Sequence, residues 1–493
     1  MKKIAVIGSG FAGLAAATCL ADAGMDVTIY EKNSSSGGRA RKFASNGYVF
    51  DMGPSWYWMP DVFEKYFNRF GKSAKDFYSL SRLSPSYRVF YSKDDVMDVP
   101  ASLEGLYQLF EDREPGSSVF LKKFLAEGKY KYEVGINKLV YKPGISIAEL
   151  FDTELFAGLF KLDVFTSISN HVRGYFKNPE LVQLLEFPVL FLGAPAQRTP
   201  ALYSLMNYAD MALGTWYPKG GMFKIAEAME ALAKQQGVKF EFNAAVDKID
   251  VASHRATQIK VNGNAIAVDG VVAGADYHHV EQHLLDKEYR HYTEKYWDRR
   301  VMAPSSLIFY LGIKKKVKNL LHHNLFFDRD FALHAKEIYD TKKWPSDPLF
   351  YVCCTSKTDD TVAPEGHENM FILIPVAPDL KDDETVRENY FHLVMNRLEA
   401  LTGDSIRAHI DYKRSYAHTD FITDYNAYKG NAYGLANTIL QTANLKPSIL
   451  NKNVINLFYT GQLTVPGPGV PPSLISGQVV AEELIKKAKS NNL

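Results

Sequence analysis

Three glycines near the start of the chain have the spacing of a diphosphate-binding turn. Gly8, Gly10 and Gly13 directly follow the apolar run 2–7, and good helix formers continue to residue 20. In such a turn the first glycine permits a tight bend, the second leaves room for a diphosphate beside the backbone, and the third lets the helix approach the strand. The helix N-terminus then faces the phosphate charge. These residues predict a dinucleotide site.

An acidic residue and a polar loop extend this motif. A second expected strand, 26–30, ends at Glu31, where a carboxylate would hydrogen-bond a ribose hydroxyl. The following stretch closes on Gly38 and Arg39, and Arg39 either neutralises the diphosphate or lies beside an electron-rich ring. The alternative is a solvated loop. A glycine motif alone is weak, but the strand, the helix and the acid together favour a bound nucleotide.

The elements that must position this site come from distant parts of the chain. Residues 268–276 end in small side chains and are expected to join the first sheet. Residues 454–459 predict a further strand, residues 466–472 a rigid loop, and residues 473–489 a helix. A second helix N-terminus after a glycine turn suits an anionic or electron-rich edge of the same cofactor.

The middle of the chain predicts two other regions. Residues 101–214 have mainly helical patterns, whereas strand candidates between residues 300 and 450 predict a separate antiparallel sheet on the substrate side. The most apolar part, from Ile145 to Leu192, is either a buried helical core or an exposed surface that contacts a membrane interface.

Composition narrows the class of protein. With 493 residues, 46% hydrophobic and 23% charged, the chain is expected to form a globular protein of more than one domain. A net charge of +1 without a basic stripe gives no reason to expect a nucleic-acid partner. Three cysteines form no disulfide framework, which indicates a reducing, cytoplasmic setting. An N-terminus that opens on a strand does not read as a signal peptide, and no apolar run is long enough to span a bilayer, so any membrane association is expected to be peripheral.

NAD and FAD both fit the first motif, and two observations favour FAD. The chain has one dinucleotide-binding glycine turn at its start, a second unit of glycine and helix at its end, and no further GxGxxG between them. An enzyme that passes hydride from NAD(P)H to flavin usually needs two dinucleotide-binding turns. With the flavin as the only dinucleotide, electrons leave to a diffusible acceptor such as a quinone or oxygen.

On these residues the chain resembles the bacterial-type phytoene desaturases, the carotenoid branch of the flavin amine-oxidase superfamily. The resemblance covers nearly the whole chain through residues 5–39, 51–54, 200–222, 273–276 and 456–477. The last segment is the most specific, because it keeps the family's frame at Gly461, Thr464, Pro466, Gly467, Gly469 and Pro471.

This last segment also departs from the family pattern. Val465 stands where the family usually has His, and Gln462, Leu463 and Pro472 replace small residues. The histidine is therefore not essential here. The exact carotenoid stays open, because relatives that act on hydroxylated carotenoids share the scaffold.

The resemblance implies bound FAD, a long apolar channel for a C40 carotenoid and attachment to a membrane surface. It implies cofactor contacts at Gly8, Gly10, Phe11, Ala12, Gly13, Glu31, Lys32, Gly38, Arg39, Gly53, Pro54, Val246, Ala273, Gly461, Gln462, Val470 and Pro471. The expected fold class is α/β, with three domains. The first is a Rossmann-like FAD-binding domain (1–85, 215–300 and 451–493). The second is an antiparallel-sheet substrate domain (86–135 and 301–450), and the third is a helical, membrane-proximal subdomain (136–214).

Desaturation needs hydride transfer to the flavin and loss of a proton from the neighbouring carbon, so no catalytic triad is required. Asp163, in an apolar helical segment, is the candidate for stabilising positive charge or accepting the proton, and the alternative is a surface-facing carboxylate. The pairs His278-His279 and His322-His323 raise the question of a metal. Adjacent residues in a helix do not share a face, and no carboxylate or cysteine falls at ligand spacing, so no metal is expected.

The sequence therefore favours an FAD-dependent carotenoid desaturase with phytoene as first substrate. The second candidate desaturates the 3,4 bond of a 1-hydroxy-carotenoid. An amine or porphyrinogen oxidase is a further enzyme alternative, which the long apolar stretch disfavours. A different class is a non-catalytic prenyl-binding protein on the same scaffold, against which the intact nucleotide cradle argues.

Overall fold

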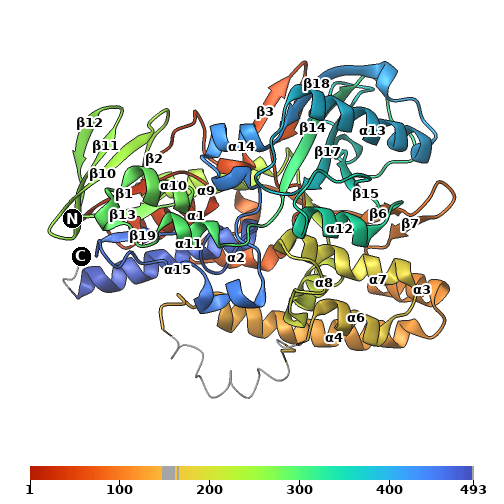
Figure 1. The fold of residues 1–493 in the computed structure, drawn as a ribbon, viewed down its shortest axis with the longest axis horizontal. Helices are drawn as coiled ribbons and strands as arrows, with labels where there is room; N and C mark the ends of the chain where they lie inside the picture. Colours follow the sequence, from red (N-terminus) through yellow and green to blue (C-terminus); the bar gives the residue numbers. More distant parts are fainter. Residues whose placement is uncertain (147–161, 164–165, 491–493) are drawn as a thin grey trace.

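A parallel sheet gathers strands from four distant parts of the chain. The computed structural model describes residues 1–146, 162–163 and 166–490. Within them, five parallel strands lie in the order β19 (Leu457–Tyr459), β13 (Gly270–Ala273), β1 (Lys3–Ile7), β2 (Asp26–Tyr30) and β9 (Lys239–Glu241). The expected return of residues 268–276 to the first sheet is confirmed, and the strand expected at 454–459 also joins this sheet. The two ends of the chain thus lie in one sheet (Figure 1).

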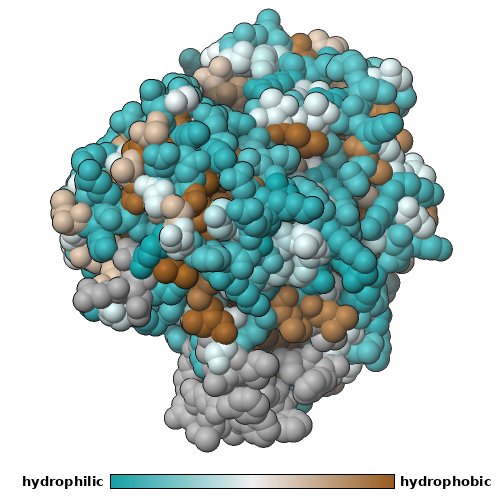
Figure 2. All heavy atoms as spheres, turned by 60° about the vertical axis from the view of Figure 1, so that its left-hand side comes forward, coloured by the Kyte–Doolittle hydropathy of each residue, from teal (hydrophilic) through white to brown (hydrophobic). Residues whose placement is uncertain are grey.

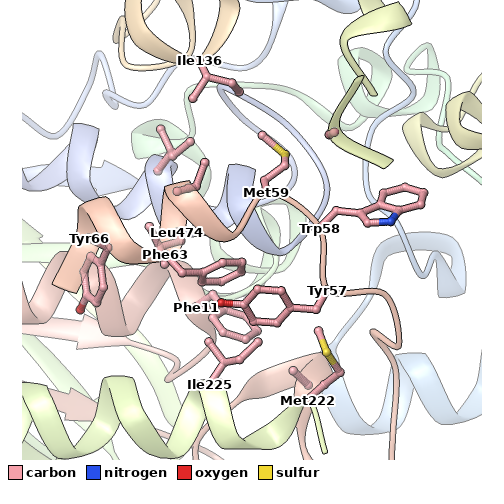
Figure 3. Packing of buried hydrophobic residues seen from close by; sticks show 14 of the residues in the cluster. Phe11, Tyr57, Trp58, Met59, Phe63, Tyr66, Ile136, Met222, Ile225 and Leu474 are labelled. Atoms are coloured by element: carbon pink, nitrogen blue, oxygen red, sulfur yellow. The ribbon is translucent and has the colours of Figure 1, made fainter. Parts of the chain in front are cut away.

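Helices α1 (Phe11–Asp22) and α15 (Val470–Lys489) pack on this sheet, and α9 (Phe223–Gln235) packs on α1. Helix α1 is buried from Phe11 to Leu20, because it lies between the sheet and the two other helices. Figure 3 shows Phe11 beside Tyr57, beside Phe63 of α2 (Pro60–Asn68) and near Leu474 of α15. Hydrophobic burial therefore holds the N-terminal and C-terminal helices together.

A larger mixed sheet forms the other half of the molecule. Its order is β18 (Ile410–Tyr416), β14 (Ser305–Ile313), β17 (Glu368–Val376), β16 (Phe350–Cys353), β15 (His323–Phe326), β6 (Tyr87–Phe90) and β7 (Val96–Val99). Every pair is antiparallel except β15 and β6. The antiparallel sheet expected from residues 300–450 is confirmed, and β6 adds one parallel pair to it. These two strands come from chain segments far apart in sequence, so no hairpin fixes their direction.

Smaller sheets and helices complete the fold. The small sheets consist of β3 (Lys42–Ser45) with β4 (Tyr48–Asp51), β5 (Leu80–Arg82) with β8 (Trp216–Pro218), and β10 (Val246–Ala252), β11 (Arg255–Val261) and β12 (Asn264–Ala267). Five further α-helices are α10 (Tyr277–His279), α11 (Glu294–Asp298), α12 (Phe331–Tyr339), α13 (Glu384–Thr402) and α14 (His418–Tyr425). Helix α13 packs on the large sheet, where the Phe391 and Phe309 rings lie 5.4 Å apart.

The described part of the segment from residue 101 to 214 is mainly helical, as expected. Its helices α3 (Leu103–Arg113), α4 (Ser117–Val134), α6 (Ile168–Tyr175), α7 (Pro179–Glu186) and α8 (Leu205–Met211) form a layer beside the large sheet (Figure 1). Part of the apolar run singled out in the sequence, Leu155–Phe160, lies outside the described residues. Among the described helices, none has the length and apolar character needed to cross a bilayer. The division into three domains stays a prediction.

Candidate functional site

Each of the three glycines at the start of α1 has the geometry its task requires. Gly8 has a φ of +93°, which a side chain rarely tolerates, and a Cβ at Gly13 would lie 2.0 Å from the Gly8 carbonyl oxygen. A Cβ at Gly10 would meet no atom within 4 Å, so open space faces this residue. Gly10 also caps α1. The turn is therefore closed on the strand side and open beside the helix N-terminus, as a diphosphate requires.

Glu31 lies at the end of β2, buried beside this turn. Its carboxylate accepts hydrogen bonds from the Ser9 backbone N and Oγ, both at 2.8 Å, and from the Asn33 backbone N and Nδ2, both at 2.9 Å. The side chain is 4% exposed. The carboxylate is thus held within the glycine turn, where a nucleotide ribose is expected.

The C-terminal segment contacts the same turn. A Cβ at Gly461 would lie 3.9 Å from the Ala12 Cβ, and a Cβ at Gly477 would lie 2.2 Å from the Ala12 carbonyl oxygen. The Ser476 Oγ accepts a hydrogen bond of 3.0 Å from the Gly461 backbone N. The two ends of the chain therefore form one site, because α15 lies in direct contact with α1.

Arg39 lies between the glycine turn and the C-terminal loop. With its amide oxygen turned toward the guanidinium, Gln462 accepts hydrogen bonds from both terminal nitrogens of Arg39 at 3.1 and 3.3 Å. The guanidinium also lies 5.3 Å from the Tyr425 ring centroid. Burial lowers the pKa of Arg39, while the nearby Asp276 carboxylate opposes that shift. Its Nε has no hydrogen-bond partner among the described residues, so this buried cation has capacity for a further acceptor.

Other residues that the resemblance assigned to the cofactor lie in and around this cluster. A Cβ at Gly38 would lie 3.1 Å from the Gly10 Cα, and a Cβ at Gly53 would lie 2.5 Å from the Arg39 carbonyl oxygen. Val246 and Ala273 share one buried cluster with residues of β1. Lys32 follows Glu31 directly but turns away, with its Nζ donating to the Thr423 carbonyl oxygen at 2.7 Å. Pro54 follows Gly53.

Val470 and Pro471 lie in the first turn of α15, because the helix starts at Val470. The expectation of a rigid loop up to residue 472 was wrong. Proline is tolerated in the first turn of a helix, where its missing N–H costs no hydrogen bond. The helix N-terminus is therefore closer to Gly469 than the sequence indicated.

The residues present fit a dinucleotide. An open glycine turn at a helix N-terminus, a buried carboxylate at the end of β2, and a buried cation with a free donor converge on one space. The first two suit the diphosphate and ribose of FAD, and the third suits an acceptor atom on the same ligand.

The surroundings of Asp163 differ from those expected of a proton acceptor, because its carboxylate is already paired. Its carboxylate is 36% exposed and pairs at 2.9 Å with the Nζ of Lys131, a side chain with no exposed surface. Lys131 also donates to the Ser204 Oγ at 3.2 Å. Asp163 therefore neutralises a buried lysine, and its proposed part in catalysis stays a prediction.

The large sheet brings the side chains of His322, His323 and Cys353 close together, although the cysteine is far from the histidines in the sequence. Cys353 of β16 lies directly opposite His323 of β15. One ring nitrogen each of His322 and His323 and the Cys353 Sγ lie within 4.8 Å of one another. No cysteine falls at ligand spacing from these histidines in the sequence, but the pairing of β15 with β16 brings Cys353 beside them. Burial lowers the pKa of His322 to about 3 and that of His323 well below its usual value, so both rings are neutral near pH 7.

An apolar cavity opens beside the large sheet. Its wall combines sheet residues such as Leu325 and Leu373 with Phe331 and Ile338 of α12. Tyr351 also lines it, and its hydroxyl donates to the Ser55 Oγ at 3.0 Å. Ser55 in turn lines a smaller neighbouring cavity together with Asp51. The larger cavity suits a hydrocarbon, since pockets for apolar ligands are lined by apolar and aromatic side chains.

Asp51 has a role that sequence patterns did not reveal. Its carboxylate accepts hydrogen bonds from the backbone N of Met222 at 2.7 Å and of Phe223 at 3.0 Å, at the start of α9. Burial raises its pKa to about 6, and these two amides partly oppose the shift. The residue lies 171 positions from its partner, so local helix-capping signals could not identify it.

We expect the stability of the D51N variant to differ from wild type in a pH-dependent way. Because the folded-state pKa of about 6 exceeds the unfolded value of 3.8, the folded protein binds more protons between these values. The free energy of unfolding of wild type therefore falls by about 2 kcal/mol as pH rises from 4 to 6, relative to D51N. Urea unfolding at pH 4, 5, 6 and 7 measures this difference. D360N is the control, since the Asp360 side chain is 92% exposed. A difference that stays constant over this range contradicts the prediction.

Comparison with known proteins identifies the family of this chain. Residues 11–485 match the family described as flavin containing amine oxidoreductase. The chain is 40% identical over 98% of both chains to a carotenoid 3,4-desaturase of Haloarcula japonica. It is 31% identical to a zeta-carotene-forming phytoene desaturase of Myxococcus xanthus, over 100% of this chain and 95% of that relative.

Among solved structures, an oxidoreductase from Methanosarcina mazei has the same fold. The TM-score is 0.63 at 16% sequence identity, covering 97% of this chain and all of that one. The resemblance drawn from the sequence is confirmed, and the cofactor it implied, FAD, agrees with the family. This chain belongs to the flavin containing amine oxidoreductase family.

Proposed function

We propose that this protein is an FAD-dependent carotenoid desaturase. The observation that carries the proposal is the 40% identity, over almost the full length of both chains, to a carotenoid 3,4-desaturase. Phytoene and diapophytoene desaturases at 31–33% identity support the same reaction class. The glycine turn, Glu31 and Arg39 supply the nucleotide site that a redox enzyme needs, which argues against a prenyl-binding protein without chemistry.

In this proposal the protein positions a polyene and excludes water from it. Bound FAD supplies the hydride acceptor of the desaturation. The glycine turn would hold the diphosphate, Glu31 a ribose hydroxyl, and Arg39 with Gln462 an acceptor atom of the cofactor. The apolar cavity would hold the hydrocarbon, whose binding energy comes from removing apolar surface from water. Positioning is the protein's main contribution, because the polyene itself delocalises developing charge.

Two observations bear on which carotenoid is the substrate. Phytoene is the expectation from the sequence, but the higher identity to a 3,4-desaturase favours the second candidate, a hydroxylated carotenoid. The buried Tyr339 hydroxyl has no hydrogen-bond partner among the described residues, and Tyr339 lines the apolar cavity. A buried polar group without a partner is costly, so one hydroxyl on the substrate would supply the hydrogen-bond partner that the Tyr339 hydroxyl needs. A pure hydrocarbon would leave the Tyr339 hydroxyl unpaired.

The test is turnover of two substrates presented separately in liposomes. Wild type and the Y339F variant are loaded with FAD and given phytoene or a 1-hydroxy-γ-carotene, and the polyene absorption is followed toward longer wavelength. We expect Y339F to lower kcat/KM for the hydroxylated substrate about 3- to 10-fold, the value of one hydrogen bond, and to leave phytoene turnover unchanged. Equal effects on both substrates contradict the assignment of Tyr339. If neither substrate reacts with wild type, the proposed function fails.

The remaining partners follow from the same proposal. A diffusible acceptor, either a quinone or oxygen, would reoxidise the flavin. Peripheral contact with a cytoplasmic membrane surface would deliver the water-insoluble substrate. The exposed apolar side chains Leu440 (77% exposed) and Leu445 (55%) support such a contact, and the neighbouring Asn444 Nδ2 donates to the Ser146 carbonyl oxygen at 2.7 Å, beside the exposed Ile145. Figure 2 shows apolar surface gathered toward the lower part of the view.

A further inference from the structure

His322, His323 and Cys353 form a buried cluster that the proposed desaturation does not use. One ring nitrogen of each histidine and the Cys353 Sγ lie within 4.8 Å of one another, and each of the three residues is at most 4% exposed. Cys353 lies directly opposite His323, so the pairing of β15 with β16 holds these two residues together. The ring centroids of the two histidines lie 4.4 Å apart. The cluster therefore combines two imidazoles and one thiol in the interior of the protein.

The hydrogen bonds of the two rings determine which nitrogen of each ring carries the hydrogen. The Tyr351 hydroxyl donates to the Ser55 Oγ at 3.0 Å, so it accepts from the His323 Nδ1, which lies 2.6 Å away. The Thr358 hydroxyl donates to a backbone carbonyl at 3.3 Å, so it accepts from the His322 Nδ1, also at 2.6 Å. Each neutral ring therefore carries its hydrogen on Nδ1 and a lone pair on Nε2.

Both Nε2 atoms are buried and have no hydrogen-bond partner among the described residues. A buried acceptor without a partner destabilises the folded state, and here two such acceptors belong to adjacent residues. Histidine ligands of a metal are oriented by a partner that accepts the N–H of the other ring nitrogen, and the hydroxyls of Tyr351 and Thr358 are such partners. A cation that binds the Nε2 lone pairs would remove the cost of leaving them unpaired.

The donor atoms determine the class of cation. Imidazole nitrogen and thiolate sulfur are typical ligands of Zn²⁺, whereas Mg²⁺ and Ca²⁺ take oxygen ligands. Zn–N distances of about 2.0–2.1 Å and a Zn–S distance of about 2.3 Å place the ligand atoms of a tetrahedral site ~3.3–3.7 Å apart. Because the three atoms already lie within 4.8 Å of one another, side-chain movements of ~1 Å complete this geometry.

Two carboxylates and a cavity lie beside the cluster. Asp51 lines the smaller cavity together with Cys353. Tyr217, whose ring centroid lies 4.7 Å from that of His322, donates to the Asp359 carboxylate at 3.0 Å. Negative charge at these two positions favours a cation in the cluster. The smaller cavity gives an ion a route to the sulfur, which a metal site requires.

We propose that His322, His323 and Cys353 bind one Zn²⁺ ion. The two Nε2 lone pairs and the Cys353 sulfur are its protein ligands, and the thiol proton passes to water as the Zn–S bond forms. A water from the smaller cavity is the fourth ligand, because zinc prefers four. The ion links β15 to β16 beside Tyr351, which lines the apolar cavity. Neither flavin nor carotenoid takes part, so this inference does not rest on the proposed function.

The metal content of the purified holoenzyme tests the site directly. Wild type is treated with a chelator, given Zn²⁺ or Co²⁺, and exchanged into metal-free buffer. We expect one ion per chain, and with Co²⁺ the d–d absorption of a tetrahedral site at wavelengths beyond the flavin bands.

Two variants remove single ligands. C353S replaces the sulfur by oxygen, and H322N keeps a donor at the position of Nδ1 but removes Nε2. Each should weaken Zn²⁺ binding at least ~100-fold, because even the partners of metal ligands contribute about 10- to 100-fold. If C353S does not fold, H322N decides the result.

C354S is the matched control. Cys354 is the next residue and is also buried, but it packs in a different hydrophobic cluster from Cys353. C354S should therefore bind Zn²⁺ as tightly as wild type. Addition of Zn²⁺ to the metal-free proteins should raise the melting temperature of wild type and C354S but not of C353S or H322N, because a ligand that binds the folded state stabilises it.

Three outcomes overturn the inference. Wild type that retains no ion and shows no cobalt bands lacks the site. Unchanged binding in C353S and H322N places the ion elsewhere, and equal loss in C353S and C354S attributes the effect to general packing. Carotenoid turnover tests the proposed function separately, since metal content and melting temperature are measured without substrate.

Discussion

The G477A variant should be destabilised by about 3 kcal/mol and should lose most of its bound FAD. A Cβ at position 477 would lie 2.2 Å from the Ala12 carbonyl oxygen and 2.9 Å from the Ala16 backbone N, so α15 must move away from α1. Forcing one extra methyl group into such a contact costs about 1–3 kcal/mol, and backbone atoms cannot rotate away, which places this case at the upper end. Because Gly461 and Val470 move with α15, the cofactor site opens as well.

The matched control is G174A. Gly174 also lies within a helix, α6, but a Cβ there would meet no atom within 4 Å. Alanine is the better helix former, so this variant should be as stable as wild type or up to about 1 kcal/mol more stable. Urea unfolding and the flavin content of the purified proteins measure both effects. Equal stability of G477A and G174A would show that α1 and α15 do not pack as described.

Replacing Glu31 by alanine should weaken FAD binding at least ~100-fold, as expected for the loss of charge-assisted hydrogen bonds to a ribose. The change also leaves the Ser9 and Asn33 donors without their acceptor in a buried place, which should lower the free energy of unfolding by about 1–3 kcal/mol. Titration of the FAD-free protein with FAD, followed by quenching of flavin fluorescence, gives the dissociation constants.

The control for Glu31 is E241A on the neighbouring strand. Glu241 is exposed, and its backbone oxygen accepts a hydrogen bond from the Glu31 backbone N at 2.9 Å, which the substitution keeps. E241A should therefore bind FAD as tightly as wild type. If E31A binds equally well, the dinucleotide does not lie against β2, and the site assignment fails.

Local sequence was enough to locate the nucleotide turn. The strand, the three glycines and the helix are adjacent in the chain, so their spacing alone determines which backbone groups face one another. The structure confirms the turn at Gly8 and the close approach at Gly13. The start of α15 was placed three residues too late, because consecutive prolines were assigned to a loop although the first helical turn accepts them.

Contacts between distant segments were beyond such reasoning. The pairing of His323 with Cys353 depends on strand register, and the capping of α9 by Asp51 depends on a contact across 171 residues. Neither contact leaves a local pattern, because hydrophobic periodicity reports which face of an element is buried and not what it is buried against.

The nucleotide-binding turn, the strands around it and the family resemblance could all be inferred from the order of residues, since they rest on short-range geometry and residue identity. The contact of α1 with α15 through glycine, the parallel pair in the large sheet and the unpartnered titratable groups among the described residues follow from the folded arrangement alone. The reason is that solvation and charge pairing, which set the chemistry of Arg39 and Asp51, are properties of the folded surroundings and not of the residues alone.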